Sequence, residues 1–441
     1  MNRGAKSLLA APICVTLFFS CRVPDPPVIH DPSRGAIYDT AMEPRLRRAN
    51  VHEFDKAFVP YVDTLSEPVA ITEFGDKTCR WDVFFATNRG PLKESRTVGT
   101  EEAGDENVVL DVPRYGRSDV LLPRQQRGTD PKMQAARKPL RILPVVGRRD
   151  SAPEIVATAD SHRLSETEFL DGVTGQLRRS RQQDLLLFVH GFNVNFDSAV
   201  IRTAQVALDI PFNGAVVAYC WPSQCGVFNY DEDEPINKKS VGPFTQFLKT
   251  LRAGVPAETR INIVVHSMGN RIVMESLSRL ADESREECRE PRAGIPMSHD
   301  RKPFANVVLC SPDVGRSDFL QWAPGVVAQS ELVTLYANAS DSALIASKGL
   351  HAEQRAGDAE EPLVVPGVET IDCSRIDLSL MGHSYYGSNI DVLSDQFMLI
   401  KENRPADKRP HLARKTTSGG DVYWQFHQTA EAMRVTWHFN E

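Results

Sequence analysis

The chain has 441 residues, enough for one large domain or two ordinary ones, and its 41% hydrophobic and 25% charged residues are typical of a soluble globular protein. Its 51 basic and 58 acidic residues give a formal net charge of −7, which gives no indication of nucleic-acid binding. We interpret the basic cluster at 45–48 and the arginine-rich stretch at 114–149 as solvated surface or a mobile segment, with a membrane- or polyanion-facing patch as the alternative.

The N-terminal segment is typical of an export signal. Two basic residues precede an uncharged, mainly apolar run from Ser7 to Phe19, which is too short to span a bilayer. The run ends at "LFFSC", where Cys21 resembles the lipidated cysteine of bacterial lipoproteins. We therefore expect a signal peptide at 1–21, an extended tether at 22–75 and a lipid-anchored protein of the bacterial cell envelope, with plain secretion or an uncleaved anchor as the alternatives.

Six further cysteines could pair in an exported chain: Cys79, Cys220, Cys225, Cys288, Cys310 and Cys373. The short spacing of Cys220 and Cys225 suits a local disulfide, whereas Cys310 ends an apolar run and is expected to be a buried thiol. Because no spacing of cysteine and histidine resembles a zinc site, we predict no structural metal and no cofactor.

Strand-like and helix-like segments alternate along the region 76–402. This order of βα units predicts a mostly parallel sheet with helices on both faces. An irregular insertion is expected around 113–160, and 403–441 is a C-terminal extension, either a late strand pair or an accessory segment. The expected strand-like segments are 81–89, 107–112, 184–192, 214–221, 261–265, 306–314, 332–341 and 368–374, and the expected helices are 165–179, 197–209, 243–253, 270–280 and 389–401.

The stretch "INIVVHSMGNRIVMESL" places Ser267 at a sharp joint between a strand and a helix. A short β-branched run ends at Val265, and apolar residues then recur at helical spacing from Asn270 onward. Such a joint holds the central hydroxyl above the sheet, and Gly269 provides the small residue that it requires. The pattern predicts a nucleophile elbow, although Val265 stands where glycine is usual.

A serine nucleophile needs a histidine base, and the base needs a carboxylate. In this topology both follow the serine along the chain. The later histidines are His299, His351, His383, His411, His427 and His438. His383, in "LMGHSYYGSN" between a strand and a helix, is the predicted base.

Two aspartates compete for the role of the acid. Asp341 follows the strand-like "LVTLYANAS", and Asp313 follows "NVVLCSP" one strand earlier. We favour Asp341 and keep Asp313 as the alternative acid or a helix-capping residue.

Backbone N–H groups would stabilise the oxyanion. Met268, directly after the nucleophile, supplies one predicted donor. The second is Phe192, because "FVHGFNVNF" places Gly191 where the backbone can approach a substrate.

The segments "LLLFVHGFNVNFDSA", "AYCWPS", "VVHSMGNR", "LCSPDV", "LYANASDSAL" and "GHSYYGSN" together resemble the hydrolase family catalogued as DUF900, over about residues 80–400. The resemblance implies the α/β-hydrolase fold and a triad of Ser267, Asp341 and His383. It supplies no substrate.

We therefore expect a serine hydrolase that cleaves carboxylic esters through an acyl-enzyme. Thioesters or amides are alternatives on the same triad, and a non-catalytic envelope scaffold on a degenerate hydrolase fold is the rival class. The segment 225–237, with two aromatic and four acidic residues, could cap the pocket and favours short or soluble acyl substrates. The expected partners are a small ester or acyl substrate and, through Cys21, a membrane.

Overall fold

The computed structural model describes residues 70–74, 78–90, 95–97, 108–123, 158–180, 182–210, 212–224, 229–289, 301–339, 344, 347, 353–374 and 390–426. The expected signal peptide, its Cys21 and most of the expected tether lie outside these ranges. Within them, no helix is long and apolar enough to cross a membrane.

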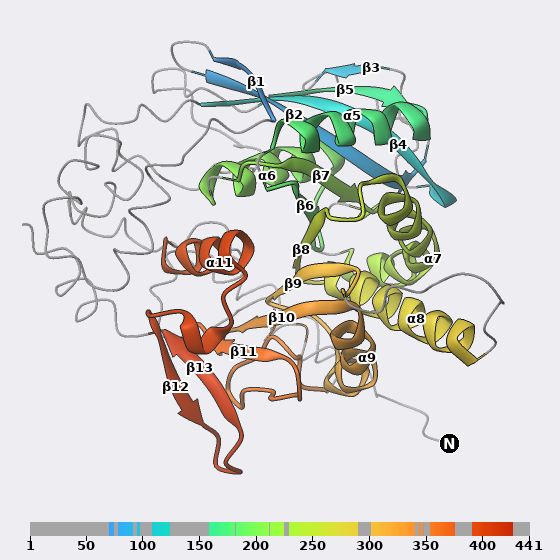
Figure 1. Ribbon diagram of the computed structural model, residues 1–441. Helices are drawn as coiled ribbons and strands as arrows, with labels where there is room; N and C mark the ends of the chain where they lie inside the picture. The colour runs from blue at the N-terminus through green and yellow to red at the C-terminus, as the bar shows by residue number, and fades with distance from the viewer. Residues whose placement is uncertain are drawn as a thin grey trace, which may run out of the picture.

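The described residues form one sheet of 13 strands (Figure 1). The sheet order is β12-β13-β11-β10-β9-β8-β6-β7-β2-β4-β5-β3, with β1 beside β2. The strands are β1 Ile71–Phe74, β2 Thr78–Arg89, β3 Ser95–Thr97, β4 Val109–Pro123, β5 Thr158–Leu164, β6 Asp184–Val189, β7 Ala215–Cys220, β8 Arg260–His266, β9 Phe304–Cys310, β10 Ser330–Ala337, β11 Glu369–Asp372, β12 Leu412–Thr416 and β13 Val422–Phe426. In this sheet order, every neighbouring pair between β13 and β2 is parallel. Antiparallel strands extend the two edges, with β12 beside β13 at one edge and β4, β5 and β3 beyond β2 at the other.

Helices cover both faces of this sheet. Those on one face are α6 Phe196–Asp209 and α11 Ile390–Glu402; those on the other are α5 Glu166–Arg179, α7 Tyr230–Gly254, α8 Gly269–Arg289 and α9 Arg316–Gln329. In Figure 1, α6 and α11 lie to one side of the strands, and α7, α8 and α9 lie to the other. The predicted mostly parallel sheet with helices on both faces is confirmed.

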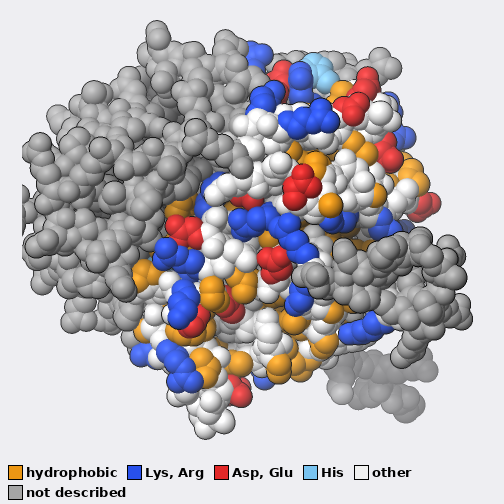
Figure 2. All heavy atoms as spheres, in the orientation of Figure 1, with side chains coloured by type: hydrophobic (Ala, Val, Ile, Leu, Met, Phe, Trp, Pro, Cys, Tyr) orange, Lys and Arg blue, Asp and Glu red, His pale blue; other side chains and the backbone are white. Residues whose placement is uncertain are grey.

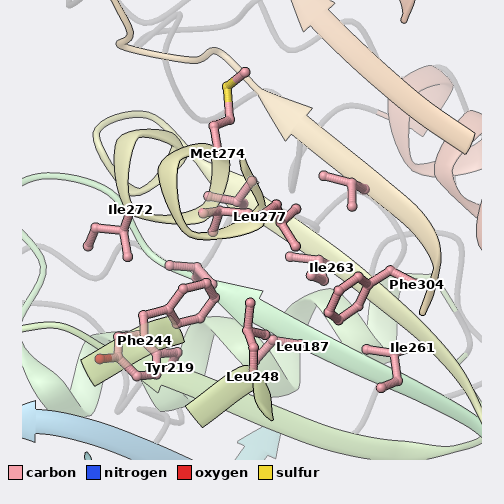
Figure 3. Close-up of a cluster of buried hydrophobic side chains, with 14 of the residues drawn as sticks. Leu187, Tyr219, Phe244, Leu248, Ile261, Ile263, Ile272, Met274, Leu277 and Phe304 are labelled. Carbon is pink, nitrogen blue, oxygen red and sulfur yellow. The ribbon is translucent and has the colours of Figure 1, made fainter. Parts of the chain in front are cut away.

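The apolar strands form because both of their faces are buried. Side chains alternate along β6, so that Leu186 packs with the α6 face while Leu187 packs with the α7 face. Figure 3 shows Leu187 and Ile263 from neighbouring strands, with Leu248 of α7 and Leu277 of α8 packed against the same side. Each such buried aliphatic side chain contributes about 1.5–3 kcal/mol to the free energy of folding. The central strands are therefore held firmly beneath the loops that follow them.

The chain reverses direction across the sheet at β6. It leaves β6 through α6 to reach β7 on one side, and then returns through α7 to β8 on the other side of β6. The loops after β6 and β8 therefore diverge at the carboxyl ends of adjacent parallel strands. In open α/β sheets a ligand-binding crevice lies at such a switch point.

Two expectations about segment boundaries differ from the structure. The helix expected at 243–253 begins at Tyr230, although Pro235 and Pro243 lie within it, because its first turns have buried contacts that sequence patterning does not reveal. Part of the irregular segment expected at 113–160 is regular: β4 continues to Pro123 and β5 begins at Thr158. Antiparallel pairing of β4 with β2 and β5 orders these arginine-rich residues.

The antiparallel edge carries a pair of facing carboxyl groups. Asp82 of β2 lies directly across from Asp119 of β4. Burial, and then the nearby Asp119, raise the pKa of Asp82 to about 6, while Arg117 acts in the opposite direction.

The C-terminal residues complete the other edge of the sheet. The strand β13 pairs in parallel with β11, and β12 pairs with β13. Asp395 of α11, fully buried, accepts hydrogen bonds from Tyr336, Arg409 and the Nε2 of His411. Burial opposes ionisation of Asp395, but Arg409 and His411 hold its pKa below the usual value. This buried network ties residues after Glu402 to the hydrolase sheet.

Three described cysteines are buried, namely Cys220, Cys310 and Cys373, and Cys220 and Cys310 are free thiols. The expectation of a buried thiol at Cys310 is confirmed, and burial raises the pKa of Cys220 to about 12. Cys225, the expected partner of Cys220, lies outside the described residues.

Candidate active site

Ser267 occupies a strained backbone position between β8 and α8. Its φ is +52°, in the left-handed region that costs a residue with a Cβ about 1–3 kcal/mol. Surrounding hydrogen bonds hold this conformation: the Ser267 N–H donates to the Cys310 carbonyl at 3.0 Å, and the Asn270 Nδ2 donates to the Ser267 carbonyl at 2.8 Å. The joint is therefore the sharp strand-to-helix turn that the sequence predicts.

Two glycines let the loop after β6 pack directly against this turn. A Cβ on Gly191 would lie 2.7 Å from the Cβ of Ser267, and a Cβ on Gly269 would meet the carbonyl oxygen of His190. Neither position tolerates a larger residue without movement. Of the predicted oxyanion residues, Phe192 directly follows Gly191, and Met268 lies between Ser267 and Gly269, so both lie beside the serine.

The N–H groups of Phe192 and Met268 have no protein acceptor within the described ranges. Met268 is fully buried, and Phe192 is half-buried with its ring 5.4 Å from that of Tyr230. Backbone donors without an internal partner beside a candidate nucleophile are what an oxyanion hole requires.

The loop that carries Phe192 is fixed from two further elements. The Trp221 Nε1 donates to the His190 carbonyl at 2.8 Å, and the two rings stack with centroids 5.3 Å apart. From β2, the buried Arg89 donates to the Val194 carbonyl at 2.7 Å. Burial, with the nearby charge of Arg89, lowers the pKa of His190 to about 3, so His190 is a neutral packing group.

His266 is also buried, with 7% of its surface exposed, and a Cβ on Gly191 would lie 2.9 Å from its Nδ1. His266 ends β8, and its ring lies against the loop that carries Phe192.

Asp313 lies at the centre of a buried ionic cluster close to the elbow. Its Oδ2 accepts from Tyr230 and, at 3.3 Å, from Arg271; its Oδ1 accepts from Ser347 at 2.6 Å and lies 3.2 Å from the Nε of Arg355. Burial alone would raise the pKa of this carboxyl, but the two arginines lower it overall. Asp313 is therefore ionised at neutral pH and held by four side chains.

Arg271 joins this cluster to two helices. It belongs to the first turn of α8, donates its Nε to the Asp313 carbonyl at 2.7 Å and pairs with Glu234 of α7 at 2.5 Å. Burial opposes its charge, but Asp313 and Tyr230 raise the pKa of Arg271. The cluster thus fixes α7 and the loop after β9 against the helix that follows Ser267.

The remaining predicted triad residues, Asp341 and His383, lie outside the described residues. Asp313, the alternative acid, contacts two arginines, a tyrosine and a serine, and no histidine among the residues described. Its acceptor positions are largely occupied by these partners. This arrangement favours a structural role for Asp313.

Sequence patterns did not indicate the roles of Arg271, Tyr230 or Ser347. These residues lie far apart in the chain, so only the tertiary fold brings them together. The "DED" at 231–233, part of the proposed cap, carried a partial signal, because acidic residues are common in the first turn of a helix.

No group of three or more histidine, cysteine, aspartate or glutamate side chains that could hold a metal ion occurs in the described part of the chain. Figure 2 shows charged side chains of both signs dispersed between small apolar groups on the described surface of one face. The exposed large apolar side chains in the described ranges are Val108, Val112 and Leu320, and Leu320 is far from the other two in the sequence.

Comparisons with known proteins found solved structures of distant similarity. Three solved structures are similar to the chain at low identity: an inhibited esterase B from Lactobacillus rhamnosis (11% identity, 51% of this chain and 82% of that chain, TM-score 0.28), the esterase Est22 (13%, 85% and 96%, 0.30) and a hyperthermophilic esterase from the archaeon Pyrobaculum calidifontis (10%, 72% and 85%, 0.27). At these scores the likeness carries no argument about chemistry. No curated protein matches the chain.

The family model described as an alpha/beta hydrolase of unknown function, DUF900, matches residues 165–402, which is more than half of the chain. This range includes β6, the elbow and α11. The chain therefore belongs to the DUF900 family of alpha/beta hydrolases.

Proposed function

We propose that the protein is a serine esterase with Ser267 as its nucleophile. The observation that carries the proposal is the strained, hydrogen-bonded Ser267 packed against Gly191, beside the N–H groups of Phe192 and Met268, which have no acceptor among the described residues. Strain retained in a buried turn is typical of functional sites, where surrounding contacts hold a geometry that the chain would otherwise avoid.

In the proposed mechanism the Oγ of Ser267 attacks the ester carbonyl while His383 takes its proton. The N–H groups of Phe192 and Met268 hold the resulting oxyanion. His383 then protonates the departing alcohol, and water hydrolyses the acyl-enzyme by the same route. Asp341 orients His383 and stabilises its charge.

The choice of Asp341 rests on the environment of Asp313. A triad acid must accept a hydrogen bond from the histidine, whereas the Asp313 carboxylate already accepts from Tyr230, Ser347 and Arg271. Releasing one of these partners would break a buried hydrogen bond to a charged group, at a cost of about 1.5–3 kcal/mol.

Hydrolysis of p-nitrophenyl acetate and butyrate by wild type, Ser267→Ala, His383→Ala, Asp341→Asn and Asp313→Asn tests this assignment. We expect losses in kcat of roughly 10⁴–10⁶-fold for the serine and histidine variants. Parallel assays with thioester and anilide analogues identify the bond class. If the wild-type protein neither hydrolyses these esters nor reacts with a fluorophosphonate, the result would favour a scaffold over an enzyme.

We also propose that the protein is exported and anchored by a lipid on Cys21, on the evidence of the sequence alone. Radiolabelled palmitate should enter wild type but not Cys21→Ala. Equal labelling of both would contradict the anchor.

A further inference from the structure

Two of the buried polar residues of α7, Asp233 and Asn237, share one face of the helix. They are four positions apart and so lie one above the other on the helix. Asp233 is fully buried and Asn237 is 1% exposed. Each reaches a different loop of the candidate site, and neither takes part in the proposed chemical steps.

Asp233 binds the loop that carries Phe192. Its carboxylate accepts a hydrogen bond from the backbone N–H of Asn193. It also accepts from the Ser223 hydroxyl at 2.5 Å and from the Gln224 N–H at 2.7 Å. Asn193 has a left-handed φ of 57°, so a charge-assisted bond holds a strained residue directly after Phe192.

Asn237 binds the other turn. Its Nδ2 donates to the Met268 carbonyl at 3.1 Å. This bond fixes the peptide after Met268, just as the bond from Asn193 fixes the peptide after Phe192. Both proposed oxyanion donors are therefore held, each through the adjacent peptide, by consecutive turns of one helix.

We propose that Asp233 and Asn237 are positioning residues that set the separation of the two oxyanion donors; this inference rests on the proposed function. An oxyanion hole requires donors within about 2.7–3.1 Å of the developing charge, and a displacement of about 1 Å can reduce the rate roughly 10²-fold. A carboxylate suits position 233 because three donors converge on it, whereas an amide would direct its own N–H groups at some of them.

The test compares Asp233→Asn and Asn237→Leu with Thr245→Val. Thr245 is a matched control, since it is buried on the same helix and its hydroxyl donates only to the Val241 carbonyl of that helix among the contacts described. Measurements are kcat and KM for p-nitrophenyl butyrate, Tm, and the inhibition constant of a trifluoromethyl ketone, whose adduct with serine carries an oxyanion.

We expect each site variant to lose roughly 10–100-fold in kcat, with KM within about 3-fold of wild type and the inhibition constant raised in parallel with the loss. Thr245→Val should match wild type in all three constants. If Asp233→Asn does not fold, Asn237→Leu alone carries the test, because its contact is separate.

If Asp233→Asn and Asn237→Leu fold and keep the wild-type kcat and inhibitor affinity, this inference is overturned while the proposed function stands. Losses confined to Tm and KM would have the same meaning. A wild-type rate that persists in Ser267→Ala would contradict the proposed function itself. The two failures are therefore distinguishable in one set of assays.

Discussion

Replacing Gly191 by alanine tests how closely the two turns of the site must pack. The added Cβ would lie 2.7 Å from the Cβ of Ser267 and 3.0 Å from the carbonyl oxygen of His266. Carbon atoms in favourable contact lie about 3.5–4.0 Å apart, so the loop must retreat by roughly 1 Å. The backbone at Ser267 resists moving instead, because its carbonyl accepts a hydrogen bond from Asn270 and its N–H donates to the Cys310 carbonyl.

A shift of this size should move the Phe192 N–H away from the oxyanion. We expect Gly191→Ala to lose about 10²-fold in kcat for p-nitrophenyl butyrate, which corresponds to about 2.7 kcal/mol of transition-state stabilisation. The close contact should also lower the free energy of unfolding by about 1–3 kcal/mol.

Gly175→Ala is the matched control, because an added Cβ at this position of α5 meets nothing within 4 Å. Alanine there should stabilise the helix by about 0.5–1 kcal/mol and leave kcat unchanged. Urea unfolding and steady-state kinetics on both variants separate stability from catalysis. A Gly191→Ala enzyme within 3-fold of the wild-type kcat would refute the idea that this contact sets the site.

The other predictions concern the acid, the pH response and the C-terminal edge. Asp313→Asn should lose about 3–5 kcal/mol of stability, because the buried Arg355 loses its ion pair with Asp313 and Arg271 keeps the Glu234 charge but loses the Asp313 charge, whereas Asp341→Asn should keep its Tm and lose kcat; the reverse pattern would make Asp313 the acid. Because the folded-state pKa of Asp313 is lowered, its contribution is present above about pH 4 and lost as the pH falls below it. The pKa of Asp82 is raised to about 6, so wild type should lose stability relative to Asp82→Asn as the pH rises from about 4 through 6, in urea titrations at several pH values; a constant difference would contradict this. Arg409→Met should lower the free energy of unfolding by about 3–5 kcal/mol, since it leaves Asp395 buried with one charge partner fewer, and an unchanged urea midpoint would show that the extension is accessory.

The parallel core could be predicted from sequence because both faces of its strands are buried. The apolar runs ending at Val189 and Val265 were sufficient to place two strands, and the abrupt change to helical spacing placed the elbow between β8 and α8. Local chemistry determines such features, so one short segment carries the whole signal.

The start of α7 could not be predicted in this way. Prolines at 235 and 243 normally oppose a helix interior, and the contacts that outweigh them come from other parts of the chain. The Asp313 cluster is a similar case, because it joins residues from four separate segments. Periodicity cannot reveal such long-range ion pairs, so the sequence alone left Asp313 open as the alternative acid.

The C-terminal strands show the same limit. The segment through "VYWQFHQ" had the composition of a strand pair, but nothing local indicated that β13 would join β11 in parallel. The buried network around Asp395 explains the docking, since Arg409 and His411 come from the extension and their partner comes from α11.

The most direct test of the account is to map the covalent adduct of a fluorophosphonate probe by mass spectrometry, in wild type and in Ser267→Ala. We expect one adduct, on Ser267, that is absent from the variant, together with a loss of at least roughly 10⁴-fold in kcat for p-nitrophenyl butyrate. A folded wild type that carries no adduct, or an adduct on another residue that persists in Ser267→Ala, would contradict the claim that the strained serine is the nucleophile.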